Sequence, residues 1–280
     1  MRIIIPKKEI QKNRITLSGE KARYLISVLR CSAGDELQVF DGEGSLYKSK
    51  ITGIENKKVV IDLLKQISLN AESPLNLILV QGILKGEKMD MVIQKATELG
   101  VKEIIPAITE RSQIRHTRKV DRWRKIAEEA SKQSGRTIIP VVHEPMEFSN
   151  FINNITPPSP PLNLRGGREG LRGFIFWEEG GLPLKEAIQK GVGDWGLGIS
   201  DKPTPNPHQP IPVFTNPQSQ NPNPCFIAVG PEGGFSKEEV NLAVSKGLVA
   251  VSLGRRILRA ETAAISAVAL VQFSLGDMGG

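Results

Sequence analysis

The chain has 280 residues, enough for two domains of ordinary size. Its 37 Lys and Arg residues outnumber 30 Asp and Glu residues and give a formal net charge of +7, which favours a polyanionic partner. No apolar run approaches the roughly 20 residues of a membrane helix, and the N-terminus does not resemble a signal peptide, so we expect a cytoplasmic protein. The two cysteines, Cys31 and Cys225, cannot form a disulfide framework or a four-ligand metal site, so no metal is expected.

The positive charge is concentrated in two segments. Residues 1–30 hold eight basic and two acidic residues, and residues 111–136 hold nine basic and three acidic residues. Phosphate contacts dominate the affinity of proteins for nucleic acids, so both segments suit a nucleic-acid backbone. Two solvated surfaces would explain the charge equally well.

The first 70 residues read as a small β-rich domain interrupted by one helix. The apolar residues at 3–5 predict a short strand, and Ser18 is a candidate N-cap for a helix whose apolar positions recur at helical spacing: Ala22, Leu25, Ile26 and Leu29. Alternating residues predict further strands at 37–39, 47–51 and 59–64, joined by turns at 41–44 and 56–58. This pattern suggests a compact barrel.

After a break at 71–74, strands alternate with helices. Residues 75–80 form a continuous apolar run, as expected for a strand buried on both faces of a parallel sheet. Helical spacing follows at 89–99, 120–130, 184–190, 236–247 and 262–275. Further strands are predicted at 101–108, 138–142, 174–177, 226–229 and 249–253. The alternation predicts an α/β domain with a mostly parallel sheet.

Two proline-rich segments interrupt this second domain. They cover about 156–173 and 191–224, and they offer too little apolar surface to offset the entropy of ordering. We therefore expect disordered or extended insertions there, within a domain of residues 74–280 that follows a domain of residues 1–70.

Two loops at expected carboxyl ends of strands carry the chemistry-bearing residues. The first is Gly230-Pro231-Glu232-Gly233-Gly234, and its glycines let the backbone approach a ligand closely. The second covers residues 254–262 and mixes Arg, Glu and apolar residues. Neither is a P-loop or a dinucleotide fingerprint, and each alone is a weak signal.

The two loops in this order form a specific family signature. The segments GPEGGFSKEE and SLGRRILRAETAA resemble the C-terminal signature of the SPOUT methyltransferase superfamily, most closely its RsmE branch, the uridine-N3 methyltransferases of small-subunit (16S) ribosomal RNA. Upstream, YLISVLRCSAGDELQVFDGEG resembles that family's PUA-like barrel. KGEKMDMVIQKATELGVKEIIPAITERS and RWRKIAEEASKQSGR resemble the first half of its catalytic domain.

This resemblance implies an N-terminal PUA-like RNA-binding β-barrel followed by a SPOUT α/β domain with a C-terminal trefoil knot. It also implies an S-adenosyl-L-methionine cofactor, a ribosomal RNA or small ribosomal subunit as partner, and a homodimer. By matching positions, the implied cofactor-binding residues are Trp177, Glu178, Gly230, Pro231, Glu232, Gly233, Gly234, Leu253, Gly254, Ile257, Leu258 and Arg259.

The resemblance also suggests roles in catalysis and RNA binding. Arg259 is a candidate to stabilise negative charge on the uracil oxygens, and Glu232 or Glu261 to accept a proton or orient Arg259. A purely structural salt bridge between Arg259 and Glu261 is the alternative. The candidate RNA-binding residues are Arg2, Arg23, Arg30, Lys85, Lys88, Arg111 and Arg136.

Two other functions stay open. A ribose 2′-O RNA methyltransferase of the same superfamily is one, although the Ser-Leu-Asn run typical of those enzymes is absent from residues 255–264. The other is a non-enzymatic RNA-binding or assembly factor, which would have little need for glycine-rich loops beside Arg259.

Overall fold

The computed structural model describes residues 1–10, 13–69, 71–155, 173–191 and 224–279. Contacts divide the chain into two units. One comprises Met1–Glu72 and Glu128–Ile139, and the other Ser73–Ala127 and Pro140–Gly280. The first unit therefore includes Glu128–Ile139 from the middle of the chain in addition to the N-terminal residues. The expected insertions at 156–173 and 191–224 lie almost entirely outside the described residues.

The first unit is built on a five-stranded sheet with the order β1-β3-β4-β5-β2. β1 and β3 pair in parallel and the other neighbours are antiparallel. Among the described residues β1 and β2 do not pair with each other, so the sheet is a half-barrel and not a closed one. The strands are β1 (Arg2–Ile4), β2 (Arg14–Leu17), β3 (Glu36–Phe40), β4 (Leu46–Glu55) and β5 (Lys58–Ile67).

The predicted helix of this unit is present but changes its winding. α1 (Gly19–Arg23) continues into the π-helical turn η2 (Tyr24–Val28), where the Leu29 N–H donates to the Tyr24 carbonyl at 3.0 Å. Ser18 occupies the N-cap position, but its side chain makes no capping hydrogen bond. A short 3-10 helix, η1 (Lys7–Glu9), precedes β2.

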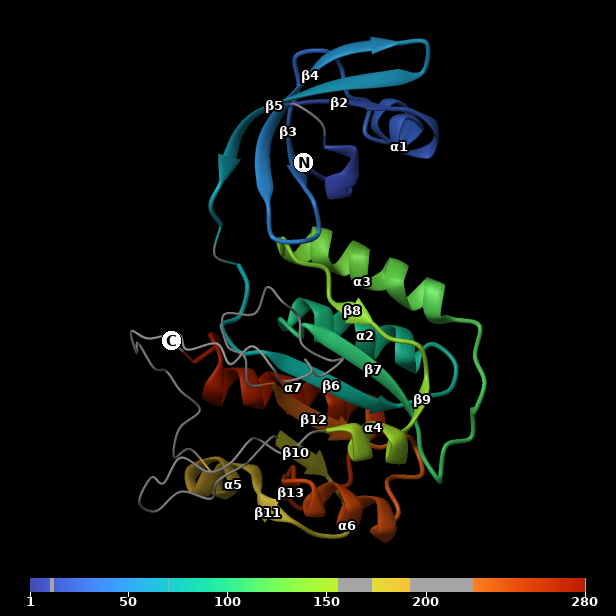
Figure 1. Ribbon diagram of the computed structural model, residues 1–280, viewed down its shortest axis with the longest axis vertical. Coiled ribbons are helices and arrows are strands. Elements are labelled where there is room, and N and C mark those ends of the chain that lie inside the picture. Colours follow the sequence, from blue (N-terminus) through green and yellow to red (C-terminus); the bar gives the residue numbers. More distant parts are fainter. Residues whose placement is uncertain (11–12, 70, 156–172, 192–223, 280) are drawn as a thin grey trace, which may run out of the picture. The chain divides into compact units, whose positions relative to one another are not determined.

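The second unit holds a parallel sheet with the order β11-β13-β10-β12-β6-β7-β8, and β9 pairs with β7 (Figure 1). Its central strands are buried along their whole length, which explains their continuous apolar sequences. The strands are β6 (Leu77–Gly82), β7 (Glu103–Ile108), β8 (Val141–Val142), β9 (Met146–Glu147), β10 (Gly173–Phe176), β11 (Leu182–Pro183), β12 (Cys225–Val229) and β13 (Leu248–Ser252).

The helices of the second part of the chain confirm most of the predicted pattern. They are α2 (Lys88–Glu98), α3 (Val120–Ser134), α4 (Phe148–Asn154), α5 (Leu184–Gly191), α6 (Lys237–Ser245) and α7 (Ala260–Leu275). α4 and α6 pack on sheet residues such as Ile78 and Val80, while α7 contacts α2 and β12. None of the described helices is long and apolar enough to cross a membrane.

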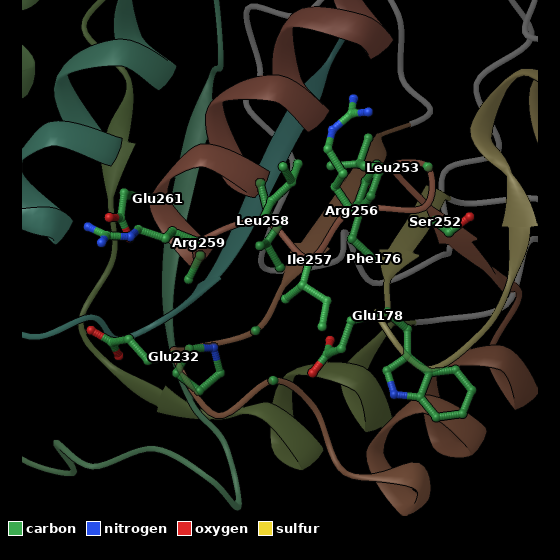
Figure 2. Close-up of a pocket in the computed structure, with 18 of the residues that line it drawn as sticks. Phe176, Glu178, Glu232, Ser252, Leu253, Arg256, Ile257, Leu258, Arg259 and Glu261 are labelled. Carbon is green, nitrogen blue, oxygen red and sulfur yellow. The ribbon is translucent and has the colours of Figure 1, made fainter.

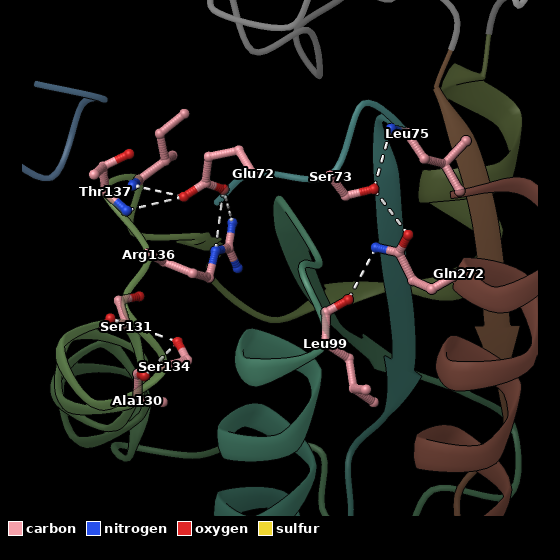
Figure 3. Close-up of polar contacts among 11 residues, drawn as sticks. Glu72, Ser73, Leu75, Leu99, Ala130, Ser131, Ser134, Arg136, Thr137 and Gln272 are labelled. Carbon is pink, nitrogen blue, oxygen red and sulfur yellow. Dashed lines mark hydrogen bonds and ion pairs between the residues drawn. The ribbon is translucent and has the colours of Figure 1, made fainter. Parts of the chain in front are cut away.

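The predicted strand at 138–142 is only partly correct. Val141 and Val142 pair with β7, but Ile138 bridges to Gly42 and Glu43 of the first unit. In that unit the Glu72 carboxylate accepts the backbone N–H groups of Thr137 and Ile138, each at 3.0 Å (Figure 3). Thr137 and Ile138 are therefore held within the first unit, and the parallel sheet resumes only at Val141.

A buried amide fixes the C-terminal helix. Gln272 of α7 donates to the Leu99 carbonyl at 2.9 Å and accepts the Ser73 hydroxyl at 2.8 Å (Figure 3). Both polar atoms of this fully buried side chain are thus satisfied. The contacts anchor the end of α7 opposite to the one that begins at Ala260.

Candidate active site

Three loops leave the carboxyl ends of neighbouring parallel strands and line a cavity of about 380 Å³. They follow β10, β12 and β13, which are adjacent in the sheet in the order β13-β10-β12. Ligands of open α/β sheets bind at this edge, and the volume suits a small-molecule or cofactor site. The first residue of α2 and the first turn of α7 complete the lining.

The loop between β12 and α6 is packed too tightly for side chains at several positions. A Cβ on Gly230 would lie 2.9 Å from the carbonyl carbon of Gly234, and Gly234 itself has a φ of +69°, which favours glycine. The Gln81 amide donates to the Gly230 carbonyl at 3.2 Å, and a Cβ on Gly82 would overlap the backbone of Pro231. The end of β6 therefore fixes the course of this loop.

The N-terminus of α6 holds a second loop in place. The Ser236 hydroxyl accepts the Glu239 N–H at 3.3 Å, and the Glu239 carboxylate accepts the Ser236 N–H at 2.9 Å, which confirms the predicted capping box. The other oxygen of Glu239 accepts the N–H of Glu110 at 2.9 Å. Next to it, the Arg111 guanidinium donates to the Gly233 carbonyl at 3.1 Å. The segment after β7 is thus tied to the β12–α6 loop.

One end of the cavity carries a lysine between two carboxylates. Lys88 Nζ lies 3.3 Å from Glu232 Oε1 and 4.0 Å from Glu261 Oε2. Glu232 Oε1 also accepts the backbone N–H of Lys85 at 3.1 Å. Burial opposes ionisation of Glu232, but the Lys85 N–H and the Lys88 ammonium outweigh it and lower the pKa of Glu232. Glu232 is therefore an ionised carboxylate and a weak proton acceptor at neutral pH.

Arg259 is the N-cap residue of α7, where its carbonyl accepts the Ala263 N–H at 2.8 Å. Its side chain is exposed, lines the cavity, and forms no ion pair with any residue that the structure describes. Figure 2 places Arg259, Glu261 and Glu232 on the same side of the cavity. The salt bridge between Arg259 and Glu261, considered from the sequence, is absent from these described contacts.

The opposite end of the cavity is formed by the loop after β10 (Figure 2). The backbone N–H of Trp177 donates to the Val251 carbonyl at 3.0 Å, while its indole Nε1 is buried without a hydrogen-bond partner. The Glu178 carboxylate lies so close to Gly234 that a Cβ there would overlap it. This end thus offers an unused donor beside an acidic group.

Comparisons with known proteins identify the family. The RNA methyltransferase domain family matches residues 71–191 and 202–272, and the RNA methyltransferase PUA domain matches residues 17–64. The ribosomal RNA small subunit methyltransferase E of Buchnera aphidicola from Acyrthosiphon pisum is 31% identical over 266 residues, covering 93% of this chain and 88% of that protein. The chain belongs to the ribosomal RNA small subunit methyltransferase E family.

Other members of the methyltransferase E family agree in sequence and fold. The protein of this name from Synechocystis is 30% identical over 96% of this chain and 76% of its own length. The crystal structure of the Neisseria gonorrhoeae protein, bound to S-adenosyl methionine, is 28% identical and superposes with a TM-score of 0.74 over 99% of this chain and 98% of that one. The α/β fold with an N-terminal PUA-like unit is therefore that of the family, whereas the trefoil knot stays a prediction.

The structure brings the sequence-predicted pocket residues of this methyltransferase E family member together, with one exception. Gly233 does not line the cavity, because its carbonyl faces Arg111. The predicted residues that do line it are Trp177, Glu178, Gly230, Pro231, Glu232, Gly234, Leu253, Gly254, Ile257, Leu258, Arg259 and Glu261. The described residues contain no cluster of His, Cys, Asp and Glu able to hold a metal ion.

The candidate RNA-binding residues fall into distinct environments. Arg23 and Arg30 are exposed and have no ion-pair partner among the described residues. Lys85 is exposed, Arg111 contacts the β12–α6 loop, and Lys88 lines the cavity. Lys88 is thus part of the pocket chemistry.

Two of these candidates are less accessible than the others. The Arg136 side chain is 3% exposed and binds the Glu72 carboxylate through Nε at 3.1 Å and Nη2 at 2.8 Å. Arg2 lies over the Phe40 ring at 5.2 Å with Nε and Nη2 buried, and this burial lowers the pKa of Arg2. These surroundings disfavour a direct phosphate contact, most clearly for Arg136, whose charge Glu72 already neutralises.

Sequence reasoning missed several residues of the site. Gly82 at the end of β6 supports Pro231, and its position at the end of a buried strand was the available signal. The missed lining residues also include Val229, Val251, Ser252 and Ala263, whereas Arg255, Arg256 and Ala260 lie in the loop at 254–262 that the sequence analysis singled out.

Proposed function

We propose that this protein transfers a methyl group from S-adenosylmethionine to N3 of a uridine in small-subunit (16S) ribosomal RNA. The observation that carries the proposal is the cavity at the strand ends in a chain that belongs to the methyltransferase E family. A family member of the same fold was crystallised with this cofactor bound. The proposed site of action is the cytoplasm.

The residues around the cavity fit this cofactor. Gly234 and Gly254 lie in the wall of the cavity, and a Cβ on Gly254 would meet open space, so backbone N–H and C=O groups of these loops can contact a purine edge. The buried Trp177 Nε1 lacks a hydrogen-bond partner in the described structure, and Trp177 lines the cavity. A buried polar atom without a partner is unfavourable, so a polar atom of the cofactor would complete this end of the site.

The chemistry divides between cofactor and protein. The bound cofactor supplies an electrophilic methyl group on a sulfonium. The protein must hold the uracil with N3 toward that methyl group and remove the N3 proton, since N3 carries a proton at neutral pH. Arg259, which no described carboxylate neutralises, is placed to stabilise negative charge on a uracil oxygen.

The test is methyl transfer from labelled S-adenosylmethionine to small subunits that lack the modification. We expect label in 16S ribosomal RNA, and nucleoside mass spectrometry should identify 3-methyluridine. Label on a ribose oxygen would favour the 2′-O alternative. RNA binding without any transfer would favour the assembly factor.

Arg23 and Arg30 of the first unit are proposed phosphate contacts. Replacing both with Ala should weaken RNA binding and reduce its salt dependence by at most about one unit of slope per lost contact. Cofactor affinity should stay unchanged. Filter binding at several salt concentrations measures the slope, with Lys237→Ala on α6 as the control. An unaltered slope in the double variant would remove both residues from the interface.

We further propose a homodimer that uses the outer face of α7. This helix buries Ala264 and Val268, yet it also exposes Leu270 and Phe273, at 44% and 61%. A helix that is apolar on more than one face is expected to be covered. Light scattering should give the mass of a dimer, and Phe273→Asp should shift it toward a monomer. A wild-type monomer at micromolar concentration would contradict the proposal.

A further inference from the structure

The two carboxylates beside Lys88 have different surroundings. Glu232 has two donors, because its Oε1 accepts both the Lys85 N–H at 3.1 Å and the Lys88 ammonium at 3.3 Å. These partners stabilise its ionised form and keep its pKa low. A carboxylate held in this way is poorly suited to take up a proton, and it is well suited to fix the position of a lysine.

Glu261, unlike Glu232, has an oxygen without a hydrogen-bond donor. Its side chain is 12% exposed, and its Oε2 is buried without a hydrogen-bond partner in the described structure. Lys88 Nζ, at 4.0 Å, is too distant for a hydrogen bond. Within the described residues no group donates a hydrogen bond to this oxygen, and Lys88 approaches it only as a long ion pair, although Glu261 lines the cavity. Buried acceptors in native proteins normally have a donor, and an exception calls for a functional explanation.

The charged groups around Glu261 come from three elements. Lys88 approaches from α2 and Glu232 from the β12–α6 loop. Arg259 precedes it by two residues and lines the same side of the cavity (Figure 2). Lys88 Nζ lies closer to Glu232 Oε1 than to Glu261 Oε2, at 3.3 Å against 4.0 Å, so Glu261 Oε2 has a positive charge nearby but no hydrogen bond from it.

We propose that Glu261 accepts the N3 proton of the target uridine, and that the ion pair between Lys88 and Glu232 positions it. The inference rests on the proposed function and separates the roles of the two carboxylates. In this step the N3–H bond breaks, its electron pair stays on N3, and the proton binds Glu261 Oε2. The nitrogen is then a nucleophile, and the neutral carboxyl group returns the proton to water after the product leaves.

The first experiment compares isosteric variants in single-turnover methyl transfer. Glu261→Gln should lower the rate about a hundredfold or more, the range of a lost general base, with unchanged cofactor and RNA affinity. Glu232→Gln should lower it less. Glu238→Gln, an exposed glutamate in the first turn of α6, is the matched control and should keep the wild-type rate.

A pH profile gives a readout that a structural role would not produce. The rate of Glu261→Gln should rise about tenfold per pH unit up to the pKa of the uridine N3–H, because the substrate then ionises without a base. RNA containing 5-fluorouridine, whose N3–H is more acidic, should restore part of the rate at neutral pH. A flat profile and no rescue would overturn the assignment.

Thermal unfolding of the protein without cofactor supplies an independent measurement. Glu261→Gln should keep or raise the melting temperature, since it removes a buried charge that no donor satisfies. Lys88→Met should lower it, because Glu232 loses its ammonium partner. A clear loss of stability in Glu261→Gln would mean that the residue is structural.

The outcomes separate this inference from the proposed function. If the wild-type protein methylates N3 and Glu261→Gln is equally fast, the inference fails and the function stands. If the wild-type protein transfers no methyl group to N3, the proposed function itself fails.

Discussion

Replacing Arg259 with Ala should leave the protein folded and the cofactor bound, yet slow methyl transfer about a hundredfold or more under saturating RNA. The guanidinium lines the cavity without an ion-pair partner among the described residues. A positive group of this kind suits negative charge that appears in the transition state only. Such a loss corresponds to about 2.7 kcal/mol of transition-state stabilisation. Single-turnover kinetics on the purified variant measures it.

A comparison variant shows whether the effect belongs to this guanidinium or to positive charge in general. Arg255 lies in the same loop and also lines the cavity, and Arg255→Ala should slow transfer far less. Calorimetric titration with S-adenosylmethionine should give affinities within about tenfold of the wild type for Arg259→Ala, since a transition-state interaction leaves ground-state binding unchanged. Near-normal transfer by Arg259→Ala would remove it from the reaction. An unfolded variant would instead indicate a structural role at the start of α7.

The parts of the fold that sequence predicted are those governed by local pattern. Buried strands such as β6 and β12 can be recognised in the sequence as apolar runs, and the Ser236 capping box marks the start of α6. α4 was missed because a helix of seven residues is shorter than the window in which helical periodicity can be recognised. The pairing of Ile138 with the first unit depends on Gly42, almost a hundred residues earlier, and no local pattern encodes it.

The candidate site likewise combines features that a local sequence pattern predicts with contacts between residues far apart in the chain. Glycine-rich loops at strand ends are visible in sequence, and the loops after β12 and β13 line one cavity. In contrast, the charge of a single residue in the sequence does not show which ion-pair partner it has in the folded protein. Arg23 and Arg136 look alike in the sequence, but Glu72, 64 residues before Arg136, neutralises only the latter. Lys88 likewise reads as one more surface cation until Glu232 and Glu261 are placed beside it. Long-range ion pairs decide which basic residues remain free.

Because the end of β6 supports the β12–α6 loop, we expect a substitution of Gly82, which lies outside the cavity wall, to affect both stability and cofactor binding. Gly82→Ala would place a methyl group against the backbone of Pro231 and Gly230, and neither can turn aside as a flexible side chain would. We expect the variant to lose about 1–3 kcal/mol in the free energy of unfolding, as overpacked sites do. We also expect cofactor affinity to fall at least about tenfold, because the shifted loop lines the cavity.

Gly53→Ala is the matched control for this prediction. Gly53 lies in β4, and a Cβ there would be 4.0 Å from the Val60 Cβ, an ordinary contact. Neither glycine has a positive φ, so the two variants differ in available space and not in backbone strain. Urea denaturation and titration with S-adenosylmethionine measure both effects. If Gly82→Ala matched Gly53→Ala in stability and affinity, β6 would not control the loop, and the loop's own glycines would have to position it.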